Sequence, residues 1–294
     1  MTLLSLLLAL LIERVTAKSV HWRAKYYVDI YVDKLIHKQW LDSQADWFNL
    51  ALVIALPSMF FLWLSNWLGS GFLGLIANAL ILFVCLGSPK FRATYKCYLQ
   101  AANRGDYQAC ELHSRDLGHD SSGSSTCESF GQHLVWLNYT HYTAIILGFI
   151  FFGAAGAVLY VLSYGVVNRI RTDYQDTENR ALINANYLIW FLDFIPVRLT
   201  ALGFLLVGHF GRALPVWLNC LFDMSVSAKI LLCRVSSAAE DIEADDGEDF
   251  ISRENTDSGD HYVFEAQILV KLAKRNIVLI MAVVSLLTMM SVVA

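Results

Sequence analysis

The sequence predicts an all-α, polytopic integral membrane protein with four or five membrane segments. Hydrophobic residues make up 56% of its 294 residues and charged residues only 16%, and the mean hydropathy is +0.47. Soluble globular domains carry more charge than this. Several apolar runs approach the length of about 20 residues that a helix needs to cross a bilayer, and segments rich in Lys and Arg separate them. We therefore expect the lipid bilayer to be a partner and residues 1–294 to form a single membrane domain.

The chain opens with an apolar segment, residues 1–12, that is too short to cross a bilayer by itself. Residues 15–40 then predict an amphipathic helix, because bulky side chains such as Trp22 and Tyr26 are interleaved with basic ones such as Lys25. A helix of this kind lies in the headgroup region of a membrane. Since a position beside the membrane explains the same basic residues, we do not expect nucleic-acid binding.

Residues 47–64 and 72–87 predict a transmembrane hairpin, because both are apolar and the turn between them, residues 65–71, carries no charge. Lys and Arg are abundant on both outer flanks of this hairpin. Cytoplasmic loops carry an excess of these residues, so we place the turn outside and both flanks in the cytoplasm. Residues 88–140 are then expected to form a cytoplasmic helical loop within the membrane domain.

Residues 142–167 are long enough to cross the membrane, but a Gly-Ala-Ala-Gly run at residues 153–156 interrupts them. A crossing segment would put Arg169 and Arg180 outside, against the tendency of basic residues to stay in the cytoplasm. A re-entrant hairpin that turns at the Gly-Ala-Ala-Gly run would keep these arginines inside. Alternatively, residues 186–208 cross back and leave only this one loop outside. The sequence leaves these alternatives open.

Residues 189–223 begin as a membrane segment and yet contain Asp193, Pro196 and Arg198. A charged side chain near the centre of a membrane helix costs about 2.5–3.5 kcal/mol, so it usually faces a polar cavity, the interface or a partner. A proline cannot donate the helical hydrogen bond and frees the carbonyl four residues earlier. We therefore expect the helix to break between residues 193 and 198, with both charges at an interfacial depth.

Three further segments complete the chain. Residues 213–233 predict an amphipathic surface helix. Residues 238–260 hold ten acidic residues against one arginine, which is too much charge for a packed core, and they predict an acidic flexible loop. Residues 277–294 are the plainest membrane span, and the Lys and Arg residues before them indicate an inside start and an outside C-terminus.

The sequence lacks the motifs of common nucleotide and metal sites. It has no G-x-x-x-x-G-K-[ST] and no H-E-x-x-H, and its six cysteines form no C-x-x-C pair. His133 and His141 lie two helical turns apart, too far to chelate one ion together. We therefore expect free thiols, no metal site and no cofactor.

A ligand site at the cytoplasmic membrane boundary is predicted from five polar residues on three segments of the chain, namely Arg104, Asp106, Asn138, Asp193 and Arg198. An arginine offers a planar fork of donors that binds a carboxylate or a phosphate through two hydrogen bonds. The set suits an anionic small-molecule ligand that carries a phosphate or a carboxylate, or an amide-bearing one, with Arg198 as its anchor. The alternative is that Asp193 and Arg198 form a structural pair inside the protein.

Residues 192–202, Leu-Asp-Phe-Ile-Pro-Val-Arg-Leu-Thr-Ala-Leu, resemble a motif shared by AmpE proteins and the cobalamin-biosynthesis membrane proteins CobD and CbiB. The similarity to the AmpE family extends over nearly the whole chain. It includes Leu-Leu-Ile-Glu-Arg at residues 10–14, Tyr-Leu-Gln-Ala-Ala-Asn-Arg-Gly-Asp at residues 98–106 and Leu-Val-Trp-Leu-Asn-Tyr at residues 134–139. It closes with Ala-Leu-Pro-Val-Trp at residues 213–217.

The resemblance implies a multi-pass protein of the bacterial inner membrane that regulates β-lactamase induction and cell-wall recycling signals with a cytoplasmic AmpD-like amidase. The alternative is a membrane-bound enzyme that forms amide bonds, as CobD and CbiB do. Those proteins typically carry an Asp pair upstream of the proline, where this chain has Ile189 and Trp190, and their Asp-Gly is missing after Asn138. We therefore expect regulation without required catalysis, and we leave the oligomeric state open, a homodimer included.

Overall fold

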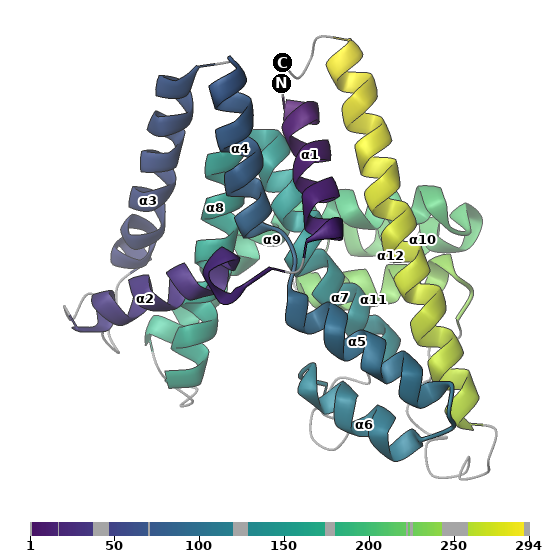
Figure 1. The fold of residues 1–294 in the computed structure, drawn as a ribbon. Helices are drawn as coiled ribbons and strands as arrows, with labels where there is room; N and C mark the ends of the chain where they lie inside the picture. Colours follow the sequence, from purple (N-terminus) through teal and green to yellow (C-terminus); the bar gives the residue numbers. More distant parts are fainter. Residues whose placement is uncertain are drawn as a thin grey trace. The chain divides into compact units, whose positions relative to one another are not determined.

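Helices form the secondary structure throughout the part of the chain that the computed structural model describes, and no strand occurs among these residues (Figure 1). The described residues are 2–16, 18–37, 47–69, 71–119, 129–173, 180–221, 223, 226–242 and 258–290. The chain divides into two compact units. Unit 1 comprises Met1–Gly87, His141–Pro196 and Met281–Ala294, and unit 2 comprises Ser88–Thr140 and Val197–Ile280.

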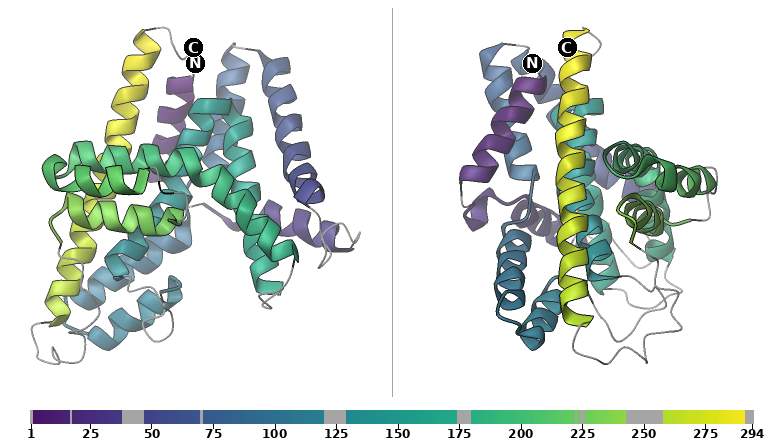
Figure 2. Two further views of the ribbon diagram at one scale, coloured as in Figure 1. Left: turned by 180° about the vertical axis from the view of Figure 1, so that it is seen from behind. Right: turned by 90° about the vertical axis from the view of Figure 1, so that its right-hand side faces the viewer.

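Unit 1 is built from the following helices: α1 (Thr2–Val15), the short η1 (Val20–Trp22), α2 (Ala24–His37), α3 (Trp47–Leu68), α4 (Phe72–Cys85), α8 (Ala144–Asp173), the first part of α9 (Arg180–Val207) and the last residues of α12 (Ser258–Met289). In this unit α4 packs against α1 and α8, and α3 packs against α8, as Figures 1 and 2 show from three sides.

The two helices of the predicted hairpin are present as α3 and α4, and its crossing of the membrane stays a prediction. Neither helix carries a charged residue, and α3 is about 33 Å long at 1.5 Å per residue, enough to cross a bilayer core. Gly69 ends α3 in the left-handed backbone conformation, with φ of +67°. The hydroxyl of Ser65 donates to Asn78 Oδ1 at 3.3 Å, so the mid-helix amide of α4 has a partner on α3.

The chain folds back on itself within α8, at Gly153. This glycine has φ of +63° and ψ of −151°, which are not helical values. In a straight helix Gly148 and Gly156 would lie about 12 Å apart. Instead, a Cβ atom added to Gly156 would lie only 2.0 Å from the carbonyl oxygen of Gly148, so the two arms meet backbone to backbone. Of the alternatives that the sequence leaves open, the structure therefore contains the hairpin.

The amphipathic helix expected near the N-terminus is present as α2, which lies across the open ends of these two hairpins. Its Tyr31 hydroxyl donates to the carbonyl of Val53 at 2.8 Å, near the start of α3. Its Val28 packs against Gly165, where a Cβ atom would lie 2.2 Å from Val28 Cγ1. Gly165 is about 18 Å along the helix from the turn at Gly153. Both hairpins therefore turn away from α2.

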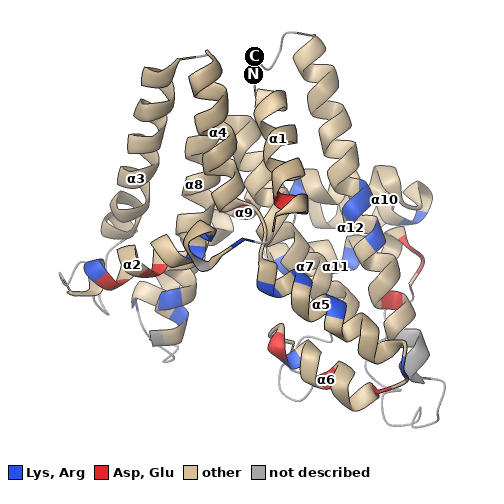
Figure 3. Cartoon of the chain, viewed as in Figure 1, with Lys and Arg blue, Asp and Glu red and all other residues tan. Residues whose placement is uncertain are grey.

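Most of the described charged residues of unit 1 lie on α2 and at the C-terminal ends of α1 and α8 (Figure 3). The others are Lys18, Arg23, Arg180 and Asp193. α3, α4 and the described residues of the turn between them carry none. Arg169, at the C-terminal end of α8, pairs with Asp33 of α2, so the basic residues there lie at the same end of the unit as α2. Of the alternatives that the sequence leaves open, this arrangement favours the one that keeps Arg169 on the same side of the membrane as α2.

The expected break in the segment with Pro196 is not found, because α9 runs as one helix from Arg180 to Val207 with the proline inside it. A proline removes one hydrogen bond but does not by itself end a helix whose neighbours pack closely around it. Ala185, Asp193 and Ala201 on this helix are all fully buried. Packing therefore holds the segment helical through the proline.

Unit 2 contains α5 (Pro89–Ala102), α6 (Tyr107–Asp116), α7 (Phe130–Asn138), α10 (Phe210–Leu221), α11 (Ala228–Ala239) and the remaining parts of α9 and α12. The predicted helical segment over residues 88–140 is mostly helical in its described part, as α5, α6 and α7, and its cytoplasmic placement stays a prediction. α7 starts with a capping box, in which Ser129 and Gln132 satisfy each other's backbone amides. A π-helix, η2 (Tyr139–Thr143), follows α7 directly.

The single surface helix expected over residues 213–233 is wrong, because two helices occupy this region. α10 ends at Leu221, and Ser227 begins α11 by accepting a hydrogen bond from the amide of Ile230. α11 is not a surface helix, since Leu231, Leu232 and Val235 on it are buried. Apolar residues recur at helical spacing on both sides of the boundary between α10 and α11, so the sequence pattern does not reveal that the two helices are separate.

Most of the predicted acidic loop, residues 238–260, lies outside the described residues. At its two ends, α11 includes residues 238 and 239, and α12 begins at Ser258.

The described helices confirm the predicted fold class, an all-α polytopic membrane protein. Four helical stretches are long and apolar enough to cross a membrane, namely Trp47–Leu68, Phe130–Thr172, Arg180–Val207 and Val263–Met289. A fifth candidate is the pair Phe72–Cys85 and Pro89–Ala102, which is bent by 50°. The stretch Phe130–Thr172 contains the turn at Gly153, so its length does not make it a single crossing.

Candidate functional site

Asp193 is fully buried in unit 1, and its carboxylate accepts hydrogen bonds from two tyrosines of α8. The hydroxyl of Tyr160 lies 2.9 Å from Oδ1, and the hydroxyl of Tyr164 lies 2.6 Å from Oδ2. The two tyrosines are one helical turn apart and therefore share a face of the second arm of α8. Because a buried charge without partners is strongly unfavourable, these phenols stabilise the carboxylate. Asp193 thus fastens α9 to the α8 hairpin.

A second buried carboxylate in unit 1 belongs to Glu13, at the C-terminal end of α1. The hydroxyl of Tyr142 donates to Glu13 Oε1 at 3.1 Å. Gly87 closes the other side of the carboxylate, since a Cβ atom there would lie 2.3 Å from Oε1, and its φ is +74°. The amide of Gly87 donates to the carbonyl of His141 at 2.9 Å. Only glycine fits this position, where α1, the end of α4 and the start of the α8 hairpin meet.

Lys18 is also buried in unit 1, and its ammonium group lies against the C-terminal end of α4. Its Nζ donates to the carbonyls of Phe83 and Leu86 and lies 4.4 Å from the centroid of the Phe83 ring. The last carbonyls of a helix carry partial negative charge and attract a cation, and an aromatic face adds to this attraction. Lys18 therefore holds the segment after α1 on α4.

Arg198 is half-buried in unit 2, where it links α9 with the end of α10. Its Nε donates to the carbonyl of Leu221 at 3.0 Å, and Trp217 Nε1 donates back to the Arg198 carbonyl at 3.4 Å. Arginine side chains commonly satisfy the last carbonyls of a helix in this way. The guanidinium therefore has a structural contact of its own, whatever else it binds.

Arg104 and Asp106 lie on the turn between α5 and α6 in unit 2. Gly105 between them has φ of +70°, a conformation that favours glycine. The carboxylate of Asp106 accepts a hydrogen bond from the amide of Ala109 at 3.0 Å and caps α6. Both side chains are exposed. Asn138, by contrast, is buried at the end of α7, directly before the π-helix.

The five residues predicted to bind a ligand are divided between the two units. Asp193 belongs to unit 1, and Arg104, Asp106, Asn138 and Arg198 belong to unit 2. Their convergence on one ligand therefore stays a prediction. The contacts described above tie Asp193 to two tyrosines and Arg198 to a helix end.

In the described ranges, no group of three or more His, Cys, Asp or Glu side chains is arranged to hold a metal ion. The described cysteines, which are Cys85, Cys97, Cys110, Cys220 and Cys233, are free thiols as predicted.

Sequence reasoning missed the tyrosine partners of Asp193 and the role of Lys18. The tyrosines carry a weak signal, because two phenols four residues apart in a membrane segment share one helical face. The signal does not name their partner, since Asp193 is 29 residues from the nearer tyrosine. Lys18 looks like one of several basic residues beside a membrane and gives no sign that it is buried.

Comparison with known proteins assigns the chain to a protein family. A family model described as "Regulatory signalling modulator protein AmpE" matches residues 1–294. A curated relative, "Protein AmpE" of Shigella flexneri, is 27% identical over 247 residues, which cover 80% of this chain and 84% of the relative. No solved structure matches the chain. Because the family model spans every residue, the chain belongs to the AmpE family of regulatory signalling modulators.

Proposed function

We propose that this protein is a regulator in the bacterial inner membrane that acts with a cytoplasmic AmpD-like amidase and modulates β-lactamase induction in response to cell-wall recycling. The observation that carries the proposal is the match to a regulatory signalling family over the full length of the chain. The candidate membrane helices and the charged end of unit 1 support a multi-pass protein with a cytoplasmic face.

The contacts of the buried polar side chains support a regulatory role. Asp193 links α9 with α8, Arg198 links α9 with α10, and Asn276 of α12 donates to the carbonyl of Thr200 on α9 at 3.4 Å. Each contact joins two helices within one unit, so a shift of one helix changes the hydrogen bonds of the next. A protein that passes on a signal needs such coupled elements.

We further propose that Arg104, Asp106, Asn138, Asp193 and Arg198 serve a ligand site for an anionic or amide-bearing cell-wall fragment or nucleotide. The π-helix directly after Asn138 supports this proposal, because π-helical turns occur frequently at functional sites. Arg104 and Asp106 are exposed, so a charged ligand can reach their side chains from solvent.

The variant Arg198→Lys tests whether Arg198 binds a ligand or only stabilises the fold. Lysine keeps the positive charge but loses the planar fork, so signalling should fall while the protein stays folded if the guanidinium binds an anion. The contact between Arg198 Nε and the Leu221 carbonyl is lost in either case, so some fall in the unfolding temperature is expected. If that contact is the only role, signalling per folded molecule should stay normal. Arg212→Lys, at an exposed position of α10, is the matched control and should change neither signalling nor thermal unfolding.

The regulatory role is tested in a bacterium that carries an inducible β-lactamase and lacks its own AmpE. Expression of this chain should restore the normal induction curve, and the protein should co-purify with the cytoplasmic amidase. Native mass spectrometry of the purified protein would identify a retained ligand. Restoration of corrinoid synthesis in a strain without CobD or CbiB would overturn the proposal and favour the amide-forming alternative.

A further inference from the structure

The surface formed by α2 and the C-terminal end of α8 has the chemistry of a binding site for charged lipid headgroups. α2 buries Val28, Val32 and Leu35 on one side and exposes Tyr27 and Ile30 on the other. An apolar side chain such as Ile30 is exposed on a helix that lies across the open ends of two apolar hairpins. A helix in this position can place its exposed side at the level of the headgroups.

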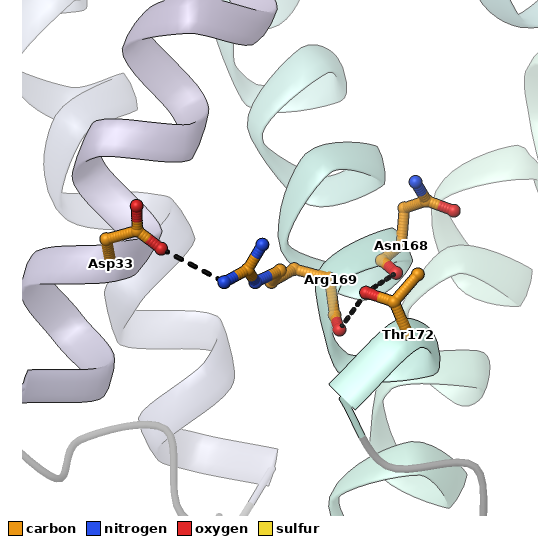
Figure 4. Close-up of polar contacts among 4 residues, drawn as sticks. All are labelled: Asp33, Asn168, Arg169 and Thr172. Carbon is orange, nitrogen blue, oxygen red and sulfur yellow. Dashed lines mark hydrogen bonds and ion pairs between the residues drawn. The ribbon is translucent and has the colours of Figure 1, made fainter.

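Basic residues outnumber acidic ones on this surface. Residues 23–37 and 168–173 contain five basic residues (Arg23, Lys25, Lys34, Arg169 and Arg171) and three acidic residues (Asp29, Asp33 and Asp173). Figure 4 shows how one acidic residue reduces the excess, since Asp33 of α2 pairs with Arg169 of α8 at 3.2 Å. Both side chains are about half exposed, so solvent screens the pair and it contributes little to stability.

Aromatic side chains flank the basic residues. Trp22, Tyr26 and Tyr27 are exposed, and the rings of Tyr26 and Tyr27 contact each other edge to face at 5.5 Å. Trp and Tyr are enriched where a membrane meets water, because each ring has an apolar body and a polar end. An acidic protein partner would be attracted by the same charges, but it would not explain aromatic rings beside the ends of uncharged membrane helices.

We propose that α2 and the C-terminal end of α8 bind the phosphate groups of anionic phospholipids through Lys25, Lys34 and Arg169, with Asp33 setting how much of the positive charge acts on the lipid. The proposal does not depend on the regulatory role. The cytoplasmic leaflet carries the anionic lipids, which is the side on which the charge pattern places this surface.

The test measures how many phosphatidylglycerol or phosphatidylcholine molecules the full-length protein retains in detergent, by native mass spectrometry at increasing lipid concentration. Each basic residue near an anionic surface changes affinity about fivefold, so Lys25→Gln with Lys34→Gln should weaken phosphatidylglycerol binding roughly 25-fold. Asp33→Asn removes one carboxylate beside Arg169 and should strengthen binding about fivefold. Retention of phosphatidylcholine should change in neither variant.

The matched control is Glu111→Gln, which removes a carboxylate 2.6 Å from Arg115 in an equally exposed pair on α6. It changes net charge as Asp33→Asn does and should leave phosphatidylglycerol binding within about twofold, because a local effect is expected. An equal rise in both variants would overturn the proposal, as would unchanged binding after both lysines are replaced.

Discussion

Removal of the Tyr164 hydroxyl tests whether Asp193 depends on its two phenol donors. Tyr164→Phe keeps the ring and leaves a fully buried carboxylate with one donor fewer. Hydrogen bonds to charged groups contribute about 1.5–3 kcal/mol. Side-chain hydrogen bonds measured inside a membrane protein average about 0.6 kcal/mol and reach about 1.7 kcal/mol. The two ranges overlap near 1.5 kcal/mol, and we expect a loss of this size for the variant.

A double variant shows whether the loss comes from this hydrogen bond. Asp193→Leu removes the acceptor, so Tyr164→Phe should cost little in that background, because replacing both partners by apolar groups can be nearly neutral. The two substitutions should therefore show a coupling energy of about 1.5 kcal/mol in a double-mutant cycle.

The assay is thermal unfolding in detergent, followed by tryptophan fluorescence. A loss of about 1.5 kcal/mol corresponds to a midpoint about 3–6 °C lower, since 1 kcal/mol shifts the midpoint by about 2–4 °C in chains of comparable size. Tyr187→Phe, at an exposed position of α9, is the control and should stay within about 1 °C of the unmodified protein. Additive losses in the cycle would refute the reasoning.

Three further predictions follow from close contacts and from one perturbed thiol. Gly165→Ala should lower the unfolding midpoint, because its Cβ would lie 2.2 Å from Val28 Cγ1, and Val28→Ala should recover most of that loss in the double variant. Gly87→Ala should abolish most of the monodisperse yield in size-exclusion chromatography, since it adds a clash at 2.3 Å to the strain of φ at +74°. Burial raises the pKa of the Cys110 thiol, so at pH 8 it holds less thiolate and should react with maleimide more slowly than the exposed Cys97. The Cys110 rate should keep rising with pH above the usual thiol range, and equal rates at pH 8 would contradict this.

Short sequence patterns predicted those helices whose formation depends on the hydropathy and charge of neighbouring residues. Two apolar runs with an uncharged turn predicted the α3–α4 hairpin, and interleaved bulky and basic residues predicted α2. The turn at Gly153 could be suspected but not chosen over a crossing, because hydropathy and length fit both. The contact that decides it joins the backbones of Gly148 and Gly156, which no side-chain pattern records.

The candidate site was predictable in its unusual residues but not in their partners. Asp193 and Arg198 stand out in the sequence because a charged side chain in a membrane segment is costly to bury. Their observed partners are tyrosines in another helix and the carbonyl of Leu221 at the end of α10. A tyrosine or a carbonyl is too common in a sequence to signal such a contact. The sequence-based prediction of a break at Pro196 failed for a related reason, since packing around α9 keeps it helical.

We predict that the turn at Gly153 makes α8 a re-entrant hairpin, which returns to the side of the membrane on which α2 lies, and that this side is the cytoplasmic one. Single cysteines at Gly71 and Thr172, in a background without native cysteines, test it directly with a membrane-impermeant maleimide. Gly71→Cys should be labelled from outside the cytoplasmic membrane, whereas Thr172→Cys should be labelled only after that membrane is permeabilised. Equal labelling of both positions from outside would contradict the re-entrant hairpin and make the segment a crossing.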